Sequence, residues 1–361
     1  GSRALPGPET GRKCPSQSTM CPPQNPVLLG VLLVVLTGPG LHASPDAVVV
    51  FNEIHYNPAG QSEEGEWIEF FNQMGIKTDV SGWRIEGIDY TFPPGTVIDP
   101  GGYLVVAKAP LAGQHGPFTG NLENGGERLR LINQSHRLMD EITYGDDGRW
   151  PEEADGSGVT LAKRRPYTAN KPPGNWTAAA QVGGTPGAKN FPSPAAASSV
   201  LINEMPSAGE DPFWVELVNV GALDAELEGM ILTAGADPLR RHAIPAQSLA
   251  AGARLVLTET ELGFRPLEHE KLFLYDSTES LVLDGRELTG SLRGRAGARG
   301  GAWLYPDVAT PGTPNTFAFH DEVVISEIMY NPPALQAGRS SSRAVENSDN
   351  QWIEVANRSA G

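Results

Sequence analysis

One pattern of apolar and polar positions occurs three times along this chain. An apolar run that contains a glutamate is followed by a short gap and then by a tryptophan-led segment of alternating apolar and acidic positions. The copies read FNEIHYNP with EWIEFFN, INEMPS with FWVELVN, and ISEIMYNP with QWIEVAN, beginning at Phe51, Ile202 and Ile325. Because a recurring unit sets the fold and the domain count of a chain, this repeat organises the whole interpretation.

Within the first copy, the pattern predicts two neighbouring strands. Residues 48–54 are apolar on both faces, which is typical of a central strand. In the segment from Trp67, alternation puts Ile68 and Phe70 on one face and Trp67 and Glu69 on the other. We therefore expect Ile68 and Phe70 to be buried, and Val215 and Leu217 to be buried in the second copy. Asn72 ends the strand, and its side chain is suited to capping the following turn.

The rest of each unit also favours short strands. Residues 103–107 follow a Pro-Gly-Gly turn, residues 127–131 match residues 270–274, and both units close on Thr-Pro-Gly followed by Asn, at 185–190 and 310–315. No long stretch with helical periodicity follows residue 43. Short strands that are separated by Gly and Pro turns, with no helices between them, predict an all-β fold of tandem antiparallel sandwiches.

The repeats divide the chain into units. We expect a first domain over 44–191, a Pro/Ala/Ser linker over 192–199, a second domain over 200–316, a short joint over 317–322, and a truncated third copy over 323–361. Because an isolated strand pair is marginal in water, the third copy is not expected to complete a core of its own.

These residues resemble the lamin-tail domain family in its bacterial, exported form. The resemblance rests on the motifs N-E-I-x-Y-N-P, W-I-E-F-x-N, S-G-W, F-P-x-G-T, P-G-G-Y-L-V, G-N-W and G-G-T-P-G-x-x-N, found at 52–58, 67–72, 81–83, 92–96, 100–105, 174–176 and 183–190. The second unit lacks several of them. The resemblance implies immunoglobulin-like β-sandwiches without catalytic activity, used as secreted or surface modules for adhesion or interaction. It also implies an alternative, a spacer before a larger exported enzyme such as a spore-coat-kinase-like one.

The N-terminus reads as an export signal. Residues 1–19 precede Met20, and a signal peptide over 20–43 contains the apolar run from Val27 and ends in small residues, with cleavage after Ala43. An uncleaved anchor is the alternative. The apolar run is too short and too interrupted for a stable membrane span. We expect a secreted or cell-envelope protein whose partner is an unidentified protein or glycan at the cell surface.

Charge and cysteine content exclude several classes of function. The formal net charge is −16, and such an acidic chain repels phosphate backbones, so nucleic acid is not expected as a partner. Arg293, Arg295 and Arg299 form one basic island, which we interpret as a solvated loop. Both cysteines, Cys14 and Cys21, precede the predicted cleavage point. With no later cysteine and only scattered histidines such as His55, we expect no enzymatic activity and no bound cofactor.

The candidate site is a pair of carboxylates that recurs in every copy: Glu53 with Glu69, Glu204 with Glu216, and Glu327 with Glu354. We favour a structural interpretation, in which one glutamate accepts backbone N–H groups and the other faces water beside the tryptophan. The alternative is an oxygen-ligand calcium site completed by Asn52 or Asn72. A glycosidase-like pair is disfavoured because it needs a cleft. Trp67, Trp214 and Trp352 share one position, and either ligand binding or packing explains it.

Overall fold

The computed structural model describes residues 47–192, 198–235, 237, 239–297, 301–319, 322–330 and 351–358. The expected signal peptide over 20–43, with Ala43, lies outside the described residues, as do residues 1–19. The regular secondary structure of the described chain is nearly all strand and every strand pair is antiparallel, which confirms the predicted all-β class. None of the helices in these ranges is long and apolar enough to cross a membrane.

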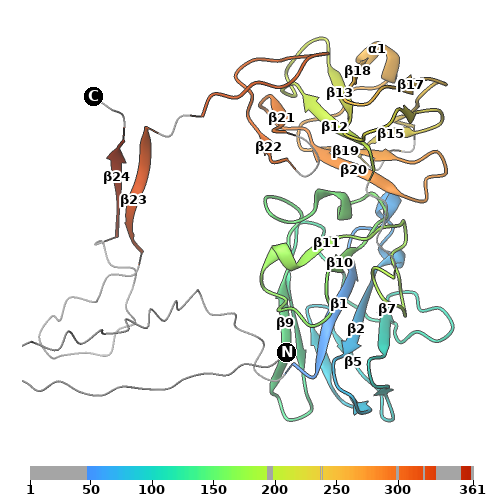
Figure 1. Cartoon of the computed structure of the whole chain (residues 1–361). Coiled ribbons are helices and arrows are strands. Elements are labelled where there is room, and N and C mark those ends of the chain that lie inside the picture. Colours follow the sequence, from blue (N-terminus) through green and yellow to red (C-terminus); the bar gives the residue numbers. More distant parts are fainter. Residues whose placement is uncertain are drawn as a thin grey trace, which may run out of the picture. The chain divides into compact units, whose positions relative to one another are not determined.

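The first sandwich, residues 47–192, has two main sheets (Figure 1). The first sheet has the order β11-β10-β1-β2-β7, formed by Trp176–Ala178, Leu161–Lys163, Val49–His55, Trp67–Asn72 and Tyr103–Ala107. The second has the order β5-β4-β8-β9, formed by Tyr90–Thr91, Arg84–Glu86, Arg128–Ile132 and Leu138–Thr143. A small pair joins β3 (Thr78–Asp79) to β6 (Val97–Ile98). The 3-10 turns are η1 (Ala59–Gln61), η2 (Glu63–Gly65), η3 (Glu152–Ala154) and η4 (Pro173–Asn175).

The second sandwich, described residues of 198–319, repeats this arrangement strand for strand. Its first sheet has the order β18-β13-β12-β21-β22, formed by Arg254–Thr258, Trp214–Asn219, Val200–Met205, Arg293–Arg295 and Trp303–Leu304. Its second has the order β16-β15-β19-β20, formed by Arg241–Ala243, Ile231–Ala234, Lys271–Tyr275 and Val282–Glu287. The small pair is β14 (Ala225–Glu226) with β17 (Ser248–Leu249). One helical turn not anticipated from the sequence, α1 (Glu259–Leu262), begins at a capping box between Thr258 and Glu261.

Each sandwich has its own apolar core. Ile68 and Phe70 lie in the first core and Val215 and Leu217 in the second, and all four side chains are fully buried. The predicted strand register is therefore confirmed. Asn72 caps its turn as expected, because its side-chain amide donates to the carbonyl oxygens of Ile76, Ile98 and Asp99 at 2.9–3.0 Å.

The hairpins at the start of the three copies share one register. Strands β1–β2, β12–β13 and β23 (Val323–Met329) with β24 (Trp352–Asn357) each pair the two glutamates directly: Glu53 with Glu69, Glu204 with Glu216, and Glu327 with Glu354. Each register also shifts immediately before the first glutamate, where one extra residue forms a β-bulge: Asn52, Asn203 and Ser326. The sequence repeat is thus a repeat of pairing geometry, bulge included.

The β23–β24 hairpin differs in exposure. In the first sandwich Phe51 and Phe70 are fully buried, whereas their counterparts Ile325 and Val355 are 60% and 61% exposed. Residues 331–350 and 359–361 of the expected third copy lie outside the described residues. Within the described part of this copy, no second sheet covers the apolar face of the hairpin.

Candidate functional site

The bulge and the strand pairing place the acid pair on the face of β1–β2 opposite the core. Phe51 pairs with Phe70 in the core, and the next pair, Glu53 with Glu69, projects from the other face. That face would meet water in an open sheet. Both glutamates are nevertheless fully buried, because the chain returns over them between Thr185 and Asn190, a segment termed here the closing loop. The expectation that Glu69 faces water is therefore wrong.

Glu53 is bound by one end of the closing loop. The backbone N–H of Thr185 donates to both carboxylate oxygens, at 3.1 and 3.2 Å, and its hydroxyl donates to Oε2 at 2.9 Å. The hydroxyl of Thr160 donates to Oε1. A buried carboxylate needs such donors, since it has lost its hydration shell.

Glu69 is bound by the other end of the loop and by the bulge residue. The Gly187 N–H donates to Oε2 at 2.5 Å, and the Asn52 amide donates to Oε1 at 2.7 Å. Asn190 completes the network, since its Nδ2 donates to the carbonyl oxygens of Asn52 and Lys163 at 2.9 and 3.0 Å. The closing loop is thus fastened to the first hairpin and to β10 through side chains of Glu and Asn.

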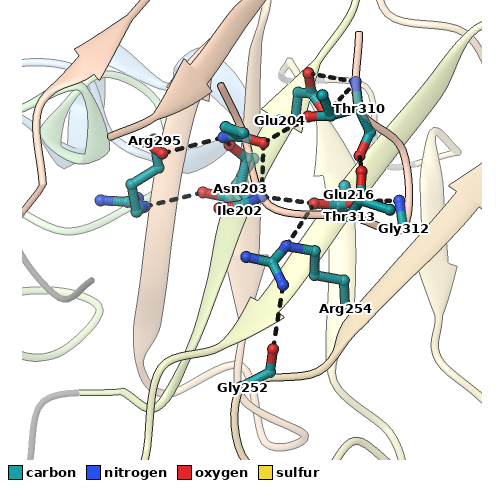
Figure 2. A network of polar contacts seen from close by, with 11 residues as sticks. Ile202, Asn203, Glu204, Glu216, Gly252, Arg254, Arg295, Thr310, Gly312 and Thr313 are labelled. Atoms are coloured by element: carbon teal, nitrogen blue, oxygen red, sulfur yellow. Dashed lines mark hydrogen bonds and ion pairs between the residues drawn. The ribbon is translucent and has the colours of Figure 1, made fainter. Parts of the chain in front are cut away.

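The second sandwich builds the same network, drawn in Figure 2. Thr310 donates through its backbone N–H and its hydroxyl to Glu204, at 3.0–3.1 Å. The Gly312 N–H and the Asn203 amide each donate to Glu216 at 2.5 Å. Asn315 again donates to two carbonyl oxygens, those of Asn203 and Arg295. One addition is Arg254, whose Nε lies 3.4 Å from Glu216 Oε1.

The β23–β24 hairpin contains the acid pair without a closing loop among its described residues. Glu327 and Glu354 are both exposed, and the bulge residue Ser326 takes the place of the asparagine. The Ser326 hydroxyl donates to Glu354 Oε1 at 2.7 Å, which reproduces the bulge-to-glutamate bond of the complete sandwiches.

Burial controls the protonation of these glutamates. Desolvation raises the pKa of Glu69 to about 8, although the bonds from Asn52 and Gly187 oppose it, and the charge of Glu53 adds to the increase. Burial also raises the pKa of Glu53, Glu204 and Glu216 above the ordinary value, against the effect of their hydrogen bonds. The acid pair therefore lies in an environment that favours a shared or retained proton.

The contacts of the acid pair bear on the calcium and glycosidase alternatives. N–H and O–H donors occupy both carboxylates in each complete sandwich, and a cation would have to displace them. Among the residues that the structure describes, no group of three or more His, Cys, Asp or Glu side chains is arranged to hold a metal ion. Asn72, considered as a calcium ligand, instead caps its turn through the bonds described above. The closing loop occupies the space over the pair, where a glycosidase would place a sugar.

A second buried polar unit was missed by the sequence reasoning. Asp140 of β9 accepts the Phe51 N–H at 2.9 Å, and Asp284 of β20 accepts the Ile202 N–H at the same distance. These bonds join the two sheets beside each bulge. The signal was present in the sequence as an aspartate on the strand that follows each of the matching segments 127–131 and 270–274.

That unit corrects the interpretation of the basic island. Arg293 and Arg295 belong to β21, and Arg295 is only 5% exposed, with its guanidinium 2.6 Å from the Asp284 carboxylate. Because the aspartate compensates its buried charge, Arg295 has a structural role, and neither Arg293 nor Arg295 lies in a solvated loop. Arg299 lies outside the described residues.

Two side chains singled out in the sequence, His55 and Trp67, are buried. Desolvation lowers the pKa of His55 to about 4. Trp67 packs on Val105 and Ala107. Trp214 is partly exposed and Trp352 is 42% exposed, so the shared position does not form one exposed aromatic site in all copies.

Comparison with known families adds to this geometry. Residues 42–146 match the family model described as Lamin Tail Domain. No curated protein matches the chain. The matched range contains the motifs at 52–58, 67–72, 81–83, 92–96 and 100–105 on which the sequence resemblance rested, and the motifs at 174–176 and 183–190 lie beyond it. The family model thus confirms the resemblance to the lamin tail domain family over residues 42–146 of this chain.

Proposed function

We propose that this chain is an exported, non-catalytic protein of tandem lamin-tail sandwiches, which serves as an adhesion or interaction module at the cell surface. The second sandwich, with its identical strand orders, and the β23–β24 hairpin, with its identical register, are taken as further copies of the same unit. The apolar segment from Val27 to the small residues before Ser44 supports export.

The observation that carries the proposal is the repeated use of the acid pair as an internal fastener. In both complete sandwiches the most conspicuous carboxylates of the sequence bind backbone and hydroxyl donors of the same chain. Groups that are used in this way hold the fold together and are not free to bind or activate a substrate. Recognition is then left to the exposed loops and the strongly acidic surface.

Calcium is not required by this proposal. We assign the acid pairs, Glu327 and Glu354 included, to a structural role. A calcium site at the same residues stays the competing interpretation, and the effect of calcium on the melting temperature of the chain separates the two.

Two experiments test the proposal. Residues 1–46 fused to an alkaline phosphatase, which is active only after export, should give activity that deletion of 20–43 abolishes. The purified full chain should bind a glycan array or the surface of intact cells, and chain that has been heat-denatured should not. Retention of the reporter in the cytoplasm contradicts export. Export without any binding favours the alternative, a spacer region of a larger exported enzyme.

A further inference from the structure

The two sandwiches present different surfaces at the same position of the fold. The strand registers show which residues are equivalent on the outer face of the second sheet in the two sandwiches. Arg84 pairs with Ile132 in the first sandwich, and Ile231 pairs with Tyr275 at the same place in the second. Where the first sandwich has Arg84 and Arg130 on this face, the second has Ile231 and Phe273. The inward residues between them, such as Leu131 and Leu274, belong to the core in both cases. At these two positions the outer face has changed from charged to apolar, whereas the core face has stayed apolar.

The apolar face of the second sandwich is covered. Ile231, Phe273 and Tyr275 are 6%, 1% and 8% exposed and form a cluster with Val282. Val282 also packs on a cluster from the first sandwich, made by Val159, Ala162 and Ala179. In the first sandwich, by contrast, the Arg130 side chain is 37% exposed and pairs with Glu86.

The cover comes from the segment between β9 and β10. The Tyr275 hydroxyl donates to the Ser157 carbonyl oxygen at 2.8 Å, and the Glu287 N–H donates to Glu152 Oε2 at 2.8 Å. Gly285 allows a close approach, because a Cβ atom there would lie 3.1 Å from Glu153 Cγ.

Charges at this contact are paired across it. Lys271 is only 7% exposed, and its ammonium contacts Asp155 and lies 3.4 Å from Asp146. The Arg286 guanidinium lies 3.7 Å from the Glu153 carboxylate. Cations of the second sandwich thus meet carboxylates of the first, and separation of the sandwiches would break these ion pairs.

The contact cannot repeat along the chain. In the first sandwich residues 144–160 separate β9 from β10, and these residues provide the bonds just described. In the second sandwich only residues 288–292 separate β20 from β21, so no corresponding segment exists to receive another sandwich.

The geometry points to a built-in docking surface: the outer face of β15–β19–β20 binds the β9–β10 segment of the first sandwich and holds the two sandwiches as one rigid body. Their separation is set by this contact and not by the Pro/Ala/Ser connection over 192–199. This goes beyond the proposed surface function, since it makes the recognition surface a fixed combination of loops from both sandwiches.

Pulsed electron paramagnetic resonance on the full chain tests the docking. Cys14 and Cys21 are the only cysteines, so a Cys14→Ser, Cys21→Ser background allows spin labels at Leu111→Cys and Leu223→Cys, which are 73% and 80% exposed. We expect one narrow distance distribution. Asp155→Lys alone and Lys271→Asp alone should each abolish the narrow peak, and the double exchange should restore it. Folding of each variant is checked by circular dichroism.

Phe273→Arg provides an independent variant, because it gives the second sandwich the residue type found at Arg130 of the first. It should broaden the distribution, whereas Arg130→Ala, the matched change on the solvated face, should leave it unchanged. A broad distribution in the unsubstituted chain overturns the proposal. So does a narrow peak that survives both single charge reversals, or a double exchange that fails to restore it.

Discussion

Glu53 and Glu69 show how a single side chain can fasten two distant segments. Each carboxylate has lost its contact with water and accepts hydrogen bonds from the closing loop instead. The carboxylates hold the loop in position, and the loop keeps the carboxylates buried. A neutral apolar residue at either position could pack but would leave the Thr185 and Gly187 N–H groups unpaired. The need to satisfy these buried donors explains why the same residue types recur in the second sandwich.

Removal of one hydroxyl should measure this effect. Thr185→Val keeps the backbone N–H but deletes the bond from the hydroxyl to Glu53 Oε2. Because a buried acceptor then lacks a partner, we expect a loss of about 1–3 kcal/mol in unfolding free energy, measured by urea denaturation. Thr168→Val removes a hydroxyl that donates to the Arg165 carbonyl oxygen at the surface and should cost less than about 0.5 kcal/mol. Equal losses would contradict the fastening role.

The pKa of Glu69 predicts a pH dependence of stability. The folded chain holds this proton up to a pKa of about 8, whereas an unfolded chain releases it near 4.5. Folded protein therefore binds more protons between these values, so stability decreases as pH rises from 6.5 to 8, by roughly 1 kcal/mol per pH unit. His55 acts in the opposite sense below pH 6.5, since its pKa falls to about 4, which is why the window begins there.

Chemical denaturation across that window should show the decrease for the unsubstituted chain and a flatter profile for Glu69→Gln. Glu64→Gln, on an exposed turn, is the control and should retain the full slope. A slope that is unchanged in Glu69→Gln would show that another group binds the proton.

At the scale of elements, the closing loop is positioned by close approach as well as by hydrogen bonds. Gly183 and Gly184 both have left-handed backbone, with φ of +80° and +65°. A Cβ atom added to Gly183 would have no atom within 4 Å, whereas a Cβ atom added to Gly184 would lie 2.5 Å from Glu53 Oε1. The two neighbours therefore separate backbone strain from steric exclusion.

Gly183→Ala should cost about 1 kcal/mol for the strained backbone alone. Gly184→Ala should cost about 1–3 kcal/mol more, because the methyl group displaces the carboxylate from its donors. Thermal melting of both variants measures the difference, and equal melting temperatures would show that the loop tolerates displacement.

The three hairpins offer a second comparison between elements. Phe70 and Val355 occupy equivalent positions, but one is fully buried and the other is 61% exposed. Phe70→Ala should destabilise the first sandwich by roughly 3–5 kcal/mol. Val355→Ala should change the unfolding free energy of the chain by less than about 0.5 kcal/mol. A large effect at Val355 would mean that the face of β23–β24 is covered in solution.

The sequence was sufficient for strands and register but not for the partners of the acid pair. Alternation around Ile68 and Phe70 determines which face enters the core, and the recurrence of Thr-Pro-Gly marked each unit's end. The alternation cannot reveal that the closing loop folds back over the face of β1–β2 opposite the core, because that contact joins residues far apart in the sequence. For the same reason Glu69 was expected in water, and Arg295 in a loop.

For the whole molecule, calcium provides the sharpest test of the acid pairs. If they are structural, millimolar calcium should not change the melting temperature of the full chain, because the oxygens already accept N–H and O–H bonds. A ligand that binds only the folded state adds about 2.7 kcal/mol at a hundredfold excess over its dissociation constant. An increase in melting temperature that is lost in Glu53→Gln would restore the calcium interpretation.

The distance along the chain between an acid pair and its closing loop also has a consequence for biosynthesis. Glu53 and Thr185 are 132 residues apart, and Glu204 and Thr310 are 106 apart. A ribosome adds about 5–20 residues per second, so the first hairpin leaves the exit tunnel many seconds before its loop exists. During that interval its glutamates stay hydrated and charged, which keeps the nascent sheet soluble. Their burial follows only when the last residues of the unit arrive, so each hairpin gains the hydrogen bonds of its closing loop after the rest of its unit has been made.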